Sequence, residues 1–407
     1  MAELDPVDPI VLGRRLADAR KARGVTQEDA AKVLDCSRPT LIAIEKGTRP
    51  PTAQEIIKLA SHYGQHVHHF LRPGEPLIDL QSHLRAAAQG SEAESPELCQ
   101  AIAELQRFAE DYRRLEEIMN APLTPNYPPE VKLGRKVNVA SLAEDVAVQE
   151  RQRLGIGDQP IIDLRNVLEA EIGLRIIYEN LPPAIAGMFA YVGDFGGIIA
   201  VNRKHPAERQ RATMLHEYGH LIVDRHKPGV DYLAAPVKRS ANERFAESFS
   251  MAFLMPATSM RRRFNEIVNT TGDFQIADLC RLSHLYFVSL EAAAVRLEGM
   301  GLIPSGMRQH LKESRVEVRK AAESLGMQQH PLNYDTLPDR YKYLAVHAYQ
   351  RGELSEGQLA RFLRCDPVTA REIVARYLTT SEVSNEGENL AVSAQAESQF
   401  SLLSEAK

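Results

Sequence analysis

Apolar side chains in the first seventy residues recur at the spacing of short amphipathic helices. Leu12, Leu16 and Ala19 lie three or four positions apart, so they share one helix face. Further apolar runs follow, separated by small and polar residues that favour turns. Besides the helix around Leu12, the elements expected in residues 10–72 are helices over Gln27–Leu34, Arg38–Lys46 and Ala53–Tyr63.

Capping residues mark the ends of these helices. Thr26 is a good N-cap, and Asp29 stands where a capping box places its acid. Ser37 can cap the next helix, and Pro39 is tolerated in its first turn because the amide there would be unpaired anyway. Gly47 ends that helix. Two short helices joined by a three-residue turn indicate a helix-turn-helix.

A helix-turn-helix places its second helix in the major groove of DNA, where the early residues face base edges. Ser37, Arg38 and Thr40 are the polar residues at that end. Gln27 can reach a phosphate or a base edge, and Lys46 can supply charge to the backbone. The other cations expected near phosphates are Arg14, Arg20, Lys21, Arg23 and Arg49.

One continuous stretch resembles the phage-repressor-type (Cro/cI, or XRE) DNA-binding domain: GVTQEDAAKVLDCSRPTLIAIEKGTRPPT, which begins at Gly24. The resemblance covers about sixty residues and implies a five-helix domain that binds an operator in double-stranded DNA, usually as a dimer. The alternative is a small helical bundle used only for protein contacts. Three nearby acids, Glu28, Asp29 and Asp35, lower the local basicity and favour modest affinity.

The region after this domain changes from linker to helix to strand. Residues 73–138 are interpreted as a linker followed by a packing or dimer helix from Pro96 to about Met119. Helices over Val139–Leu154 and Ile161–Ala170 are expected next. The β-rich runs Leu174–Tyr178, Gly187–Val192 and Gly197–Asn202 then predict a small antiparallel sheet. The edge of this sheet either binds an extended substrate backbone or only packs against other elements of the protein.

A mostly apolar run contains an H-E-x-x-H motif. Residues four apart share a helix face, so His216 and His220 can bind one ion, and two imidazoles at that spacing suit zinc. Glu217 follows about 100° around the helix, where it can take a proton from a water beside the metal. Glu243 and Glu247 share a face of the next helix. One can complete the site while the other supports a ligand histidine.

The region of residues 140 to 300 resembles the ImmA/IrrE metallopeptidase family. The segments that carry the resemblance are IIAVNR, RATMLHEYGH, NERFAESFSMAFLMP and LSHLYFVSLEAAAVRL. The resemblance implies a zincin-like peptidase in which Glu243 is the third zinc ligand. Glu247 stands where many relatives carry asparagine, which leaves it as an alternative ligand, a support for a ligand, or a surface residue.

Several residues near the motif have open roles. Many relatives of that family carry a histidine at the position of Asp224, and His226 lies close to it. Hydrolysis would use zinc to polarise the scissile carbonyl and Glu217 as general base and acid. Tyr191 and Tyr218 are alternative stabilisers of the oxyanion.

Composition limits the remaining functions. The net charge of −5 gives no overall basic signature, so nucleic-acid binding must be local to one patch. Four cysteines lie far apart and form no C-x-x-C pair, which is typical of free thiols in a reducing compartment. The N-terminus lacks the basic start and the following apolar stretch of a signal peptide, so none is expected. No apolar run is long enough to span a bilayer. A cytoplasmic protein is expected.

The C-terminal third is expected to be helical and then disordered. Residues 301–380 form a helical region in this interpretation, and residues 381–407 an acidic tail with almost no aromatic residues. Within the helical region, the segment from Ser355 to Val368 resembles a second helix-turn-helix in outline. It lacks basic residues at the start of its second helix, so it is interpreted as a helical appendage rather than a second DNA reader.

These observations predict a mainly α protein with a small antiparallel β-sheet, hence an α+β fold class. The DNA-binding domain covers 10–72 and the zinc peptidase domain 139–300. The predicted protein is a DNA-binding transcriptional regulator with a zinc-dependent endopeptidase domain that cleaves a repressor or another regulatory protein, and a homodimer is expected. The alternative is a regulator whose zinc domain senses or scaffolds without cutting.

Overall fold

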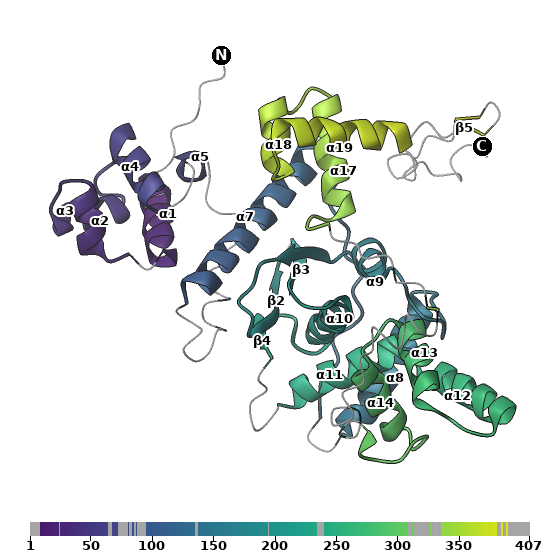
Figure 1. The fold of residues 1–407 in the computed structure, drawn as a ribbon. Coiled ribbons are helices and arrows are strands. Elements are labelled where there is room, and N and C mark those ends of the chain that lie inside the picture. The colour runs from purple at the N-terminus through teal and green to yellow at the C-terminus, as the bar shows by residue number, and fades with distance from the viewer. Residues whose placement is uncertain are drawn as a thin grey trace, which may run out of the picture. The chain divides into compact units, whose positions relative to one another are not determined.

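A computed structural model shows a chain built mostly of helices (Figure 1). It divides into two compact units, Met1–Glu110 with Thr124–Thr336 and Asp111–Leu123 with Leu337–Lys407. Most of the expected linker (73–95) and most of the expected disordered tail (381–407) lie outside the described residues. The structure describes residues 9–23, 25–63, 67–71, 80, 84, 87, 95–134, 137–193, 195–233, 240–307, 309, 311, 326–327, 330, 335–380, 384–385 and 388–389.

Five helices form the N-terminal domain, as the sequence predicts. Leu16, Leu41, Ile44 and Leu59 are buried between them, so the periodic apolar residues do form the core. Arg20 is buried as well, and its Nε lies 2.5 Å from a carboxylate oxygen of Glu45. The helices are α1 (Pro9–Ala22), α2 (Gln27–Val33), α3 (Arg38–Glu45), α4 (Ala53–Tyr63) and α5 (Val67–Phe70).

The capping residues act where the sequence places them. The Thr26 side chain accepts a hydrogen bond from the Asp29 amide, and the Ser37 side chain accepts one from the Thr40 amide. Between these caps Asp35 has φ of 54°, a left-handed conformation that reverses the chain after α2. The turn between the two helices is therefore fixed by its own backbone and cap hydrogen bonds.

The α+β fold is confirmed, with one correction to the sheet. Its four strands have the order β1-β3-β2-β4: β1 (Arg175–Glu179), β2 (Ile185–Val192), β3 (Gly196–Asn202) and β4 (Gly229–Tyr232). The pairs β2–β3 and β2–β4 are antiparallel, but β1 and β3 are parallel. The sheet is mixed because the β2–β3 hairpin inserts β3 between β1 and β2. The strand β4 lies in a segment that the sequence analysis does not assign to the sheet.

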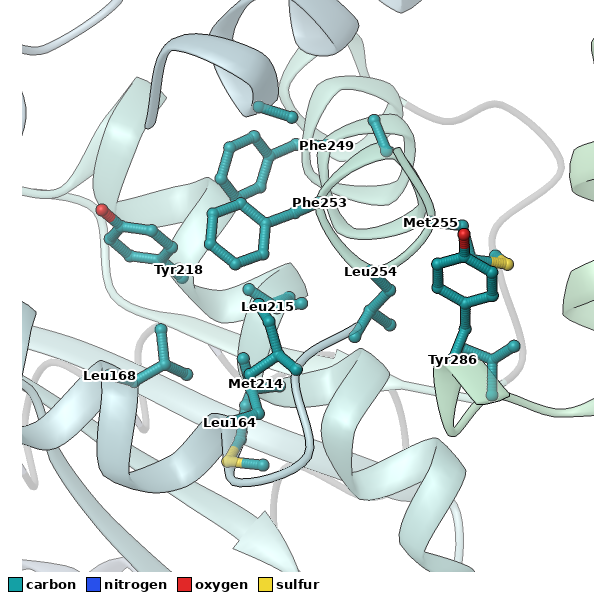
Figure 2. Packing of buried hydrophobic residues seen from close by; sticks show 14 of the residues in the cluster. Leu164, Leu168, Met214, Leu215, Tyr218, Phe249, Phe253, Leu254, Met255 and Tyr286 are labelled. Carbon is teal, nitrogen blue, oxygen red and sulfur yellow. The ribbon is translucent and has the colours of Figure 1, made fainter. Parts of the chain in front are cut away.

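Helices surround this sheet and supply most of the core. The carrier of the H-E-x-x-H motif, α10 (Ala207–Asp224), contacts β2, β3 and the following helix α11 (Ala241–Leu254). Phe249 and Phe253 of α11 lie beside Tyr218 in the buried cluster, together with Leu215 (Figure 2). The other helices of this region are α8 (Val139–Arg153), α12 (Ala257–Thr271), α13 (Ile276–Tyr286) and α14 (Leu290–Gly299).

The helix expected over Ile161–Ala170 is shorter and less regular than the sequence suggests. It begins as α9 (Leu164–Asn166) and continues as a π-helical segment (Val167–Ile172). Gly173 ends it with φ of 82°, which a residue with a side chain rarely adopts. The segment leads directly into β1.

The part of the second unit that the structure describes includes the end of α7, three C-terminal helices and two short strands. The helix α7 runs from Pro96 to Ile118, as the sequence predicts, and its residues from Asp111 onward belong to this unit. Arg340 binds Glu116 with 2.9 Å between Nη1 and Oε1. The unit's helices α17, α18 and α19 span Asp339–Gln350, Glu356–Phe362 and Pro367–Thr380, and two short strands follow, β5 (Ser384–Asn385) and β6 (Glu388–Asn389).

Candidate metal centre

Three side chains from α10 and α11 bring their ligand atoms to one point. Among the residues that the structure describes, His216, His220 and Glu243 form a group whose ligand atoms all lie within 4.8 Å of one another. The two Nε2 atoms are 3.2 Å apart. The Glu243 oxygens lie 3.4 Å from His216 Nε2 and 3.5 Å from His220 Nε2. We call these three residues the ligand triad.

These separations match what a zinc ion requires. Tetrahedral zinc with bonds of about 2.0–2.1 Å keeps neighbouring ligand atoms about 3.3 Å apart. The three separations in the triad, from 3.2 to 3.5 Å, bracket that value. Two imidazoles and one carboxylate leave the fourth position open, which is typical of catalytic rather than structural zinc sites. The ligand triad therefore fits zinc in number, type and spacing of donors.

Glu217 lies beside the triad but does not belong to it. Its side chain is 1% exposed, and Oε1 has no hydrogen-bond partner. Burial, and next the negative charge of Asp231, raise the pKa of Glu217 to about 8. A Cβ added to Gly187 of β2 would lie 3.0 Å from that Oε1 and 2.6 Å from Thr213 Cγ2. Glycine at this position of β2 therefore leaves room for the Glu217 carboxylate.

Asp224 orients one of the ligand histidines, a role that the sequence analysis does not assign. His220 Nδ1 donates to Asp224 Oδ1 over 3.0 Å, which directs Nε2 of the same ring toward the triad. Asn242 Nδ2 donates to the other oxygen of Asp224 over 2.8 Å. The signal was present in the sequence, because Asp224 follows His220 by four positions and so lies on the same helix face.

The charges of the site are mutually dependent. Burial lowers the pKa of His220, but the carboxylates of Asp224 and Glu243 outweigh it and raise that pKa to about 10. Burial also lowers the pKa of His216. The hydrogen bond with Glu243 acts in the opposite direction, and that pKa lies above its usual value. The same hydrogen bonds, first from His216 and then from His220, lower the pKa of Glu243. The carboxylates thus oppose the effect of burial on both histidines, and the two imidazoles in turn favour the charged form of Glu243.

Strand β4 contributes one more acid. Asp231 is partly buried, and burial raises its pKa while the charge of His216 lowers it. Its charge acts on Glu217 and on His216, so it belongs to the electrostatic environment of the motif. Sequence analysis misses Asp231 because it stands in a short, half-exposed strand with no alternation of polar and apolar residues.

Other residues that the sequence proposes lie elsewhere. Glu247 is exposed on α11 and is not a member of the ligand triad. The Tyr218 hydroxyl is buried and donates to Glu150 of α8, so it faces the core rather than a substrate. Tyr191 packs edge-on against His226, with 5.1 Å between ring centroids. Of the two tyrosines considered for the oxyanion, only Tyr191 keeps a partly exposed side chain.

Of the residues proposed to contact DNA, Gln27 begins α2, and Ser37, Arg38 and Thr40 lie at the start of α3, whereas Lys46 follows the end of α3. Arg38 Nη2 donates to Gln27 Oε1 over 3.3 Å, and the Ser37 and Thr40 hydroxyls are 2.9 Å apart. Ser37, Arg38 and Lys46 are exposed. Two expected phosphate contacts are instead committed within the domain: Arg20 is buried against Glu45, and Arg49 Nη2 lies 2.9 Å from Glu55.

Together, a helix-turn-helix domain and a buried H-E-x-x-H helix define a DNA-binding regulator that carries a zincin-like domain. The comparisons with known proteins agree with this class. Residues 11–69 match the helix-turn-helix domain family, and residues 169–298 match the IrrE N-terminal-like domain family. The chain belongs to the XRE-type helix-turn-helix transcription regulators and carries an IrrE/ImmA-like domain.

Individual relatives match the DNA-binding end. The cryptic phage CTXphi transcriptional repressor RstR of Vibrio cholerae is 31% identical over 86 residues, 21% of this chain and 78% of that protein. An uncharacterized HTH-type transcriptional regulator of Methanocaldococcus jannaschii is 47% identical over 45 residues, 11% of this chain and 68% of its own length. The crystal structure of ComR from Streptococcus suis is 12% identical, covers 92% of this chain and 89% of that one, and has a TM-score of 0.16.

Within the described part of the chain, none of the helices combines the length and the apolar character that crossing a bilayer requires.

Proposed function

We propose that this DNA-binding regulator carries a working zinc-dependent endopeptidase and cuts a repressor or another regulatory protein. The observation that supports it best is the arrangement of four side chains. The ligand triad has the spacing of a zinc site, and the buried Glu217 beside it has a carboxylate oxygen without a partner. A buried acceptor of this kind is unfavourable in a merely structural helix. It is useful when a water molecule must be deprotonated there.

The chain's own residues divide the work. His216, His220 and Glu243 would hold zinc, and Asp224 keeps His220 in the orientation that presents Nε2. Zinc, when bound, supplies a Lewis acid at the open position. Glu217 accepts the proton of the attacking water and returns it to the leaving amine. Gly187 leaves space for that carboxylate.

The sheet offers a place for an extended substrate. β4 pairs only with β2 and therefore forms an edge of the sheet, and Asp231 on this strand acts electrostatically on Glu217. An edge strand can add a peptide through backbone hydrogen bonds. We infer that the substrate polypeptide lies along β4, and that the regulator acts as a homodimer in the cytoplasm. The four free cysteines support a reducing compartment.

The test is co-expression of the regulator with a candidate repressor from the same genome. We expect the wild type to cleave this partner. The Glu217→Gln variant should keep zinc, measured by metal analysis, and DNA binding, measured by gel shift, but lose cleavage. His220→Ala should lose zinc as well.

The alternative is a zinc domain that senses or scaffolds. The side chain of Glu243 is 43% accessible, which leaves the metal site open to solvent. This openness favours the alternative, because it allows the metal ion to exchange with solvent. In that case the wild type leaves the partner intact, while removal of zinc with a chelator changes the affinity for DNA. Intact partner with unchanged DNA affinity would contradict both functions.

A further inference from the structure

Among the described residues, the same turn, followed at once by a new helix, occurs three times between different pairs of helices. Asp35, Phe287 and Arg364 all have a left-handed backbone, with φ of 54°, 52° and 55°. Each of these residues donates its amide to the carbonyl three positions earlier, and the next residue donates to the carbonyl five positions before it. A polar N-cap follows two positions later, at Ser37, Ser289 and Asp366. This is the Schellman ending of a helix, followed at once by a new helix.

Two of the three turns match in far more than the backbone. The helices α2 and α18 each have seven residues, and the left-handed residue follows two positions after each of them. Each begins with a hydroxyl cap, Thr26 or Ser355, that accepts the amide of the residue three positions on. A cysteine follows the left-handed residue in both, Cys36 and Cys365. Without any gap, residues 355–370 therefore correspond to residues 26–41.

Burial follows the same correspondence. Buried, half-buried and exposed side chains occur in the same order along both segments, except that Phe362 is buried where Val33 is half-buried. The start of α19 is exposed as the start of α3 is, with Val368 60% accessible in the place of Pro39. The second unit therefore presents a helix start shaped like that of the N-terminal reader (Figure 1).

The third copy of the turn shows that this exposure is not automatic. Phe287 is buried beneath the Arg211 guanidinium, 4.6 Å from its ring centroid, and Leu290 at the start of α14 is buried too. That copy only packs. The turn motif alone does not make a binding surface, but an exposed start of the second helix does.

The net charge of these helices favours an acidic partner, the class to which nucleic acid belongs, over a basic one. From Leu337 to Thr380 the chain has seven Arg or Lys residues against five Asp or Glu residues, a net charge of +2 in a chain whose total is −5. From Ser355 to Thr380, four arginines stand against three acids, whereas the N-terminal reader from Thr26 to Lys46 has three bases against four acids. Arg364 in the turn and Arg371 on α19 are both exposed.

We propose that α18 and α19 form a second DNA-binding site, which contacts the phosphate backbone of a duplex through Arg364 and Arg371 and faces the major groove with the exposed start of α19. In the absence of DNA, Arg371 Nε lies 2.7 Å from Glu356 Oε1, as Arg38 pairs with Gln27 in the first reader. The chain would then hold two half-sites of one operator, or two separate segments of DNA. Two linked DNA-binding sites raise the overall affinity, because binding of one holds the other at a high effective concentration near the DNA.

The experiment uses the full chain and a fluorescein-labelled DNA duplex of mixed sequence, with affinity measured by anisotropy over a series of salt concentrations. The double variant Arg364→Ala/Arg371→Ala should weaken binding several-fold and reduce the slope of log K against log salt by about 2. The same loss is expected in a chain whose first reader is disabled by Arg38→Ala/Lys46→Ala. Arg263→Ala, an exposed arginine of α12, is the matched control and should change nothing.

Two further variants keep the outcome clear if the double variant unfolds. Glu372→Gln removes an exposed negative charge from α19 and should tighten binding. Unchanged affinity and slope in Glu372→Gln and in a folded Arg364→Ala/Arg371→Ala chain would overturn the proposal. Val368→Glu tests the other occupant: if it dissociates the protein in sedimentation without altering DNA affinity, α19 contacts a second copy of the chain instead. All these readouts are independent of cleavage, so they stand or fall separately from the peptidase.

Discussion

Gly219 of α10 lies directly against Ala246 of α11. A Cβ added to Gly219 would be 2.7 Å from the Ala246 Cα and 3.0 Å from its Cβ. Gly219 lies on α10 between His216 and His220, and Ala246 follows Glu243 by three positions on α11. The closeness of the helices therefore determines how near Glu243 comes to His216 and His220.

Gly219→Ala should separate α10 from α11. Crowding a packed interior costs about 1–3 kcal/mol, more than the gain of about 1 kcal/mol from alanine's higher helix propensity. We expect lower stability in urea and at least several-fold weaker zinc binding in a competition with a chelator. Gly299→Ala, where a Cβ would meet nothing within 4 Å, is the control and should be neutral or stabilising. Unchanged zinc affinity in Gly219→Ala would show that the helix crossing does not set the site.

Asp224→Asn should weaken zinc binding about 10–100-fold, because a carboxylate behind a ligand histidine fixes its orientation and raises its basicity. The protein should remain folded, since Asn242 can still reach the amide. Glu247→Gln is the matched variant on α11, and we expect it to bind zinc like the wild type because that side chain is exposed and outside the ligand triad. Isothermal titration with zinc compares the two. Equal affinity in both variants would remove Asp224 from the site.

The metal-free protein should lose stability as the pH rises from about 5 to about 8. Glu217 titrates near 4.5 when unfolded, and its pKa in the folded chain is about 8. Between these values the unfolded state has released a proton that the folded state still holds, so a higher pH favours unfolding. Each pH unit in this window contributes up to about 1.4 kcal/mol.

Glu217→Gln should flatten this dependence between about pH 5 and pH 6, because glutamine does not titrate, whereas above about pH 6.5 the raised pKa of His220 leaves a slope of the same sign. Urea unfolding in the presence of a chelator, at several pH values, measures it, and Glu247→Gln should keep the slope of the wild type. Parallel curves for Glu217→Gln and the wild type would assign the pH dependence to other groups.

Arg38→Ala should weaken operator binding and reduce its salt dependence if the guanidinium contacts phosphate, by about 1 in the slope of log K against log salt. If it contacts a base, the loss should be about 1–3 kcal/mol at one position of the operator. Gel shifts with the chain's own upstream region, repeated with single-base changes, separate these cases. Arg263→Ala serves as the control. Binding as tight as that of the wild type at every salt concentration would exclude Arg38 from the interface.

Local signals made much of this molecule predictable. Thr26, Ser37 and the H-E-x-x-H motif act over three or four positions, and both caps lie where their spacing places them. Helix periodicity likewise gave α7 and α8 to within one residue. These features depend on neighbours along the chain, so the sequence contains the whole signal.

Features that depend on distant partners were not predictable in the same way. The parallel pairing of β1 with β3 results from where the β2–β3 hairpin is inserted, which no strand's own pattern reveals. β4 has only four residues and is half-exposed throughout, so it becomes a strand only because β2 is there to pair with it. Asp231 was missed for that reason, whereas Asp224 was visible as the residue four positions after His220.

All three proposed metal ligands, the proposed general base and the two acids near them occur between His216 and Glu243, in one uninterrupted segment of the chain. None of them comes from the DNA-binding domain or from the C-terminal unit. The domains at either end, and with them the DNA sequence that the protein binds, can therefore change in evolution while this short segment keeps the residues of the proposed zinc site.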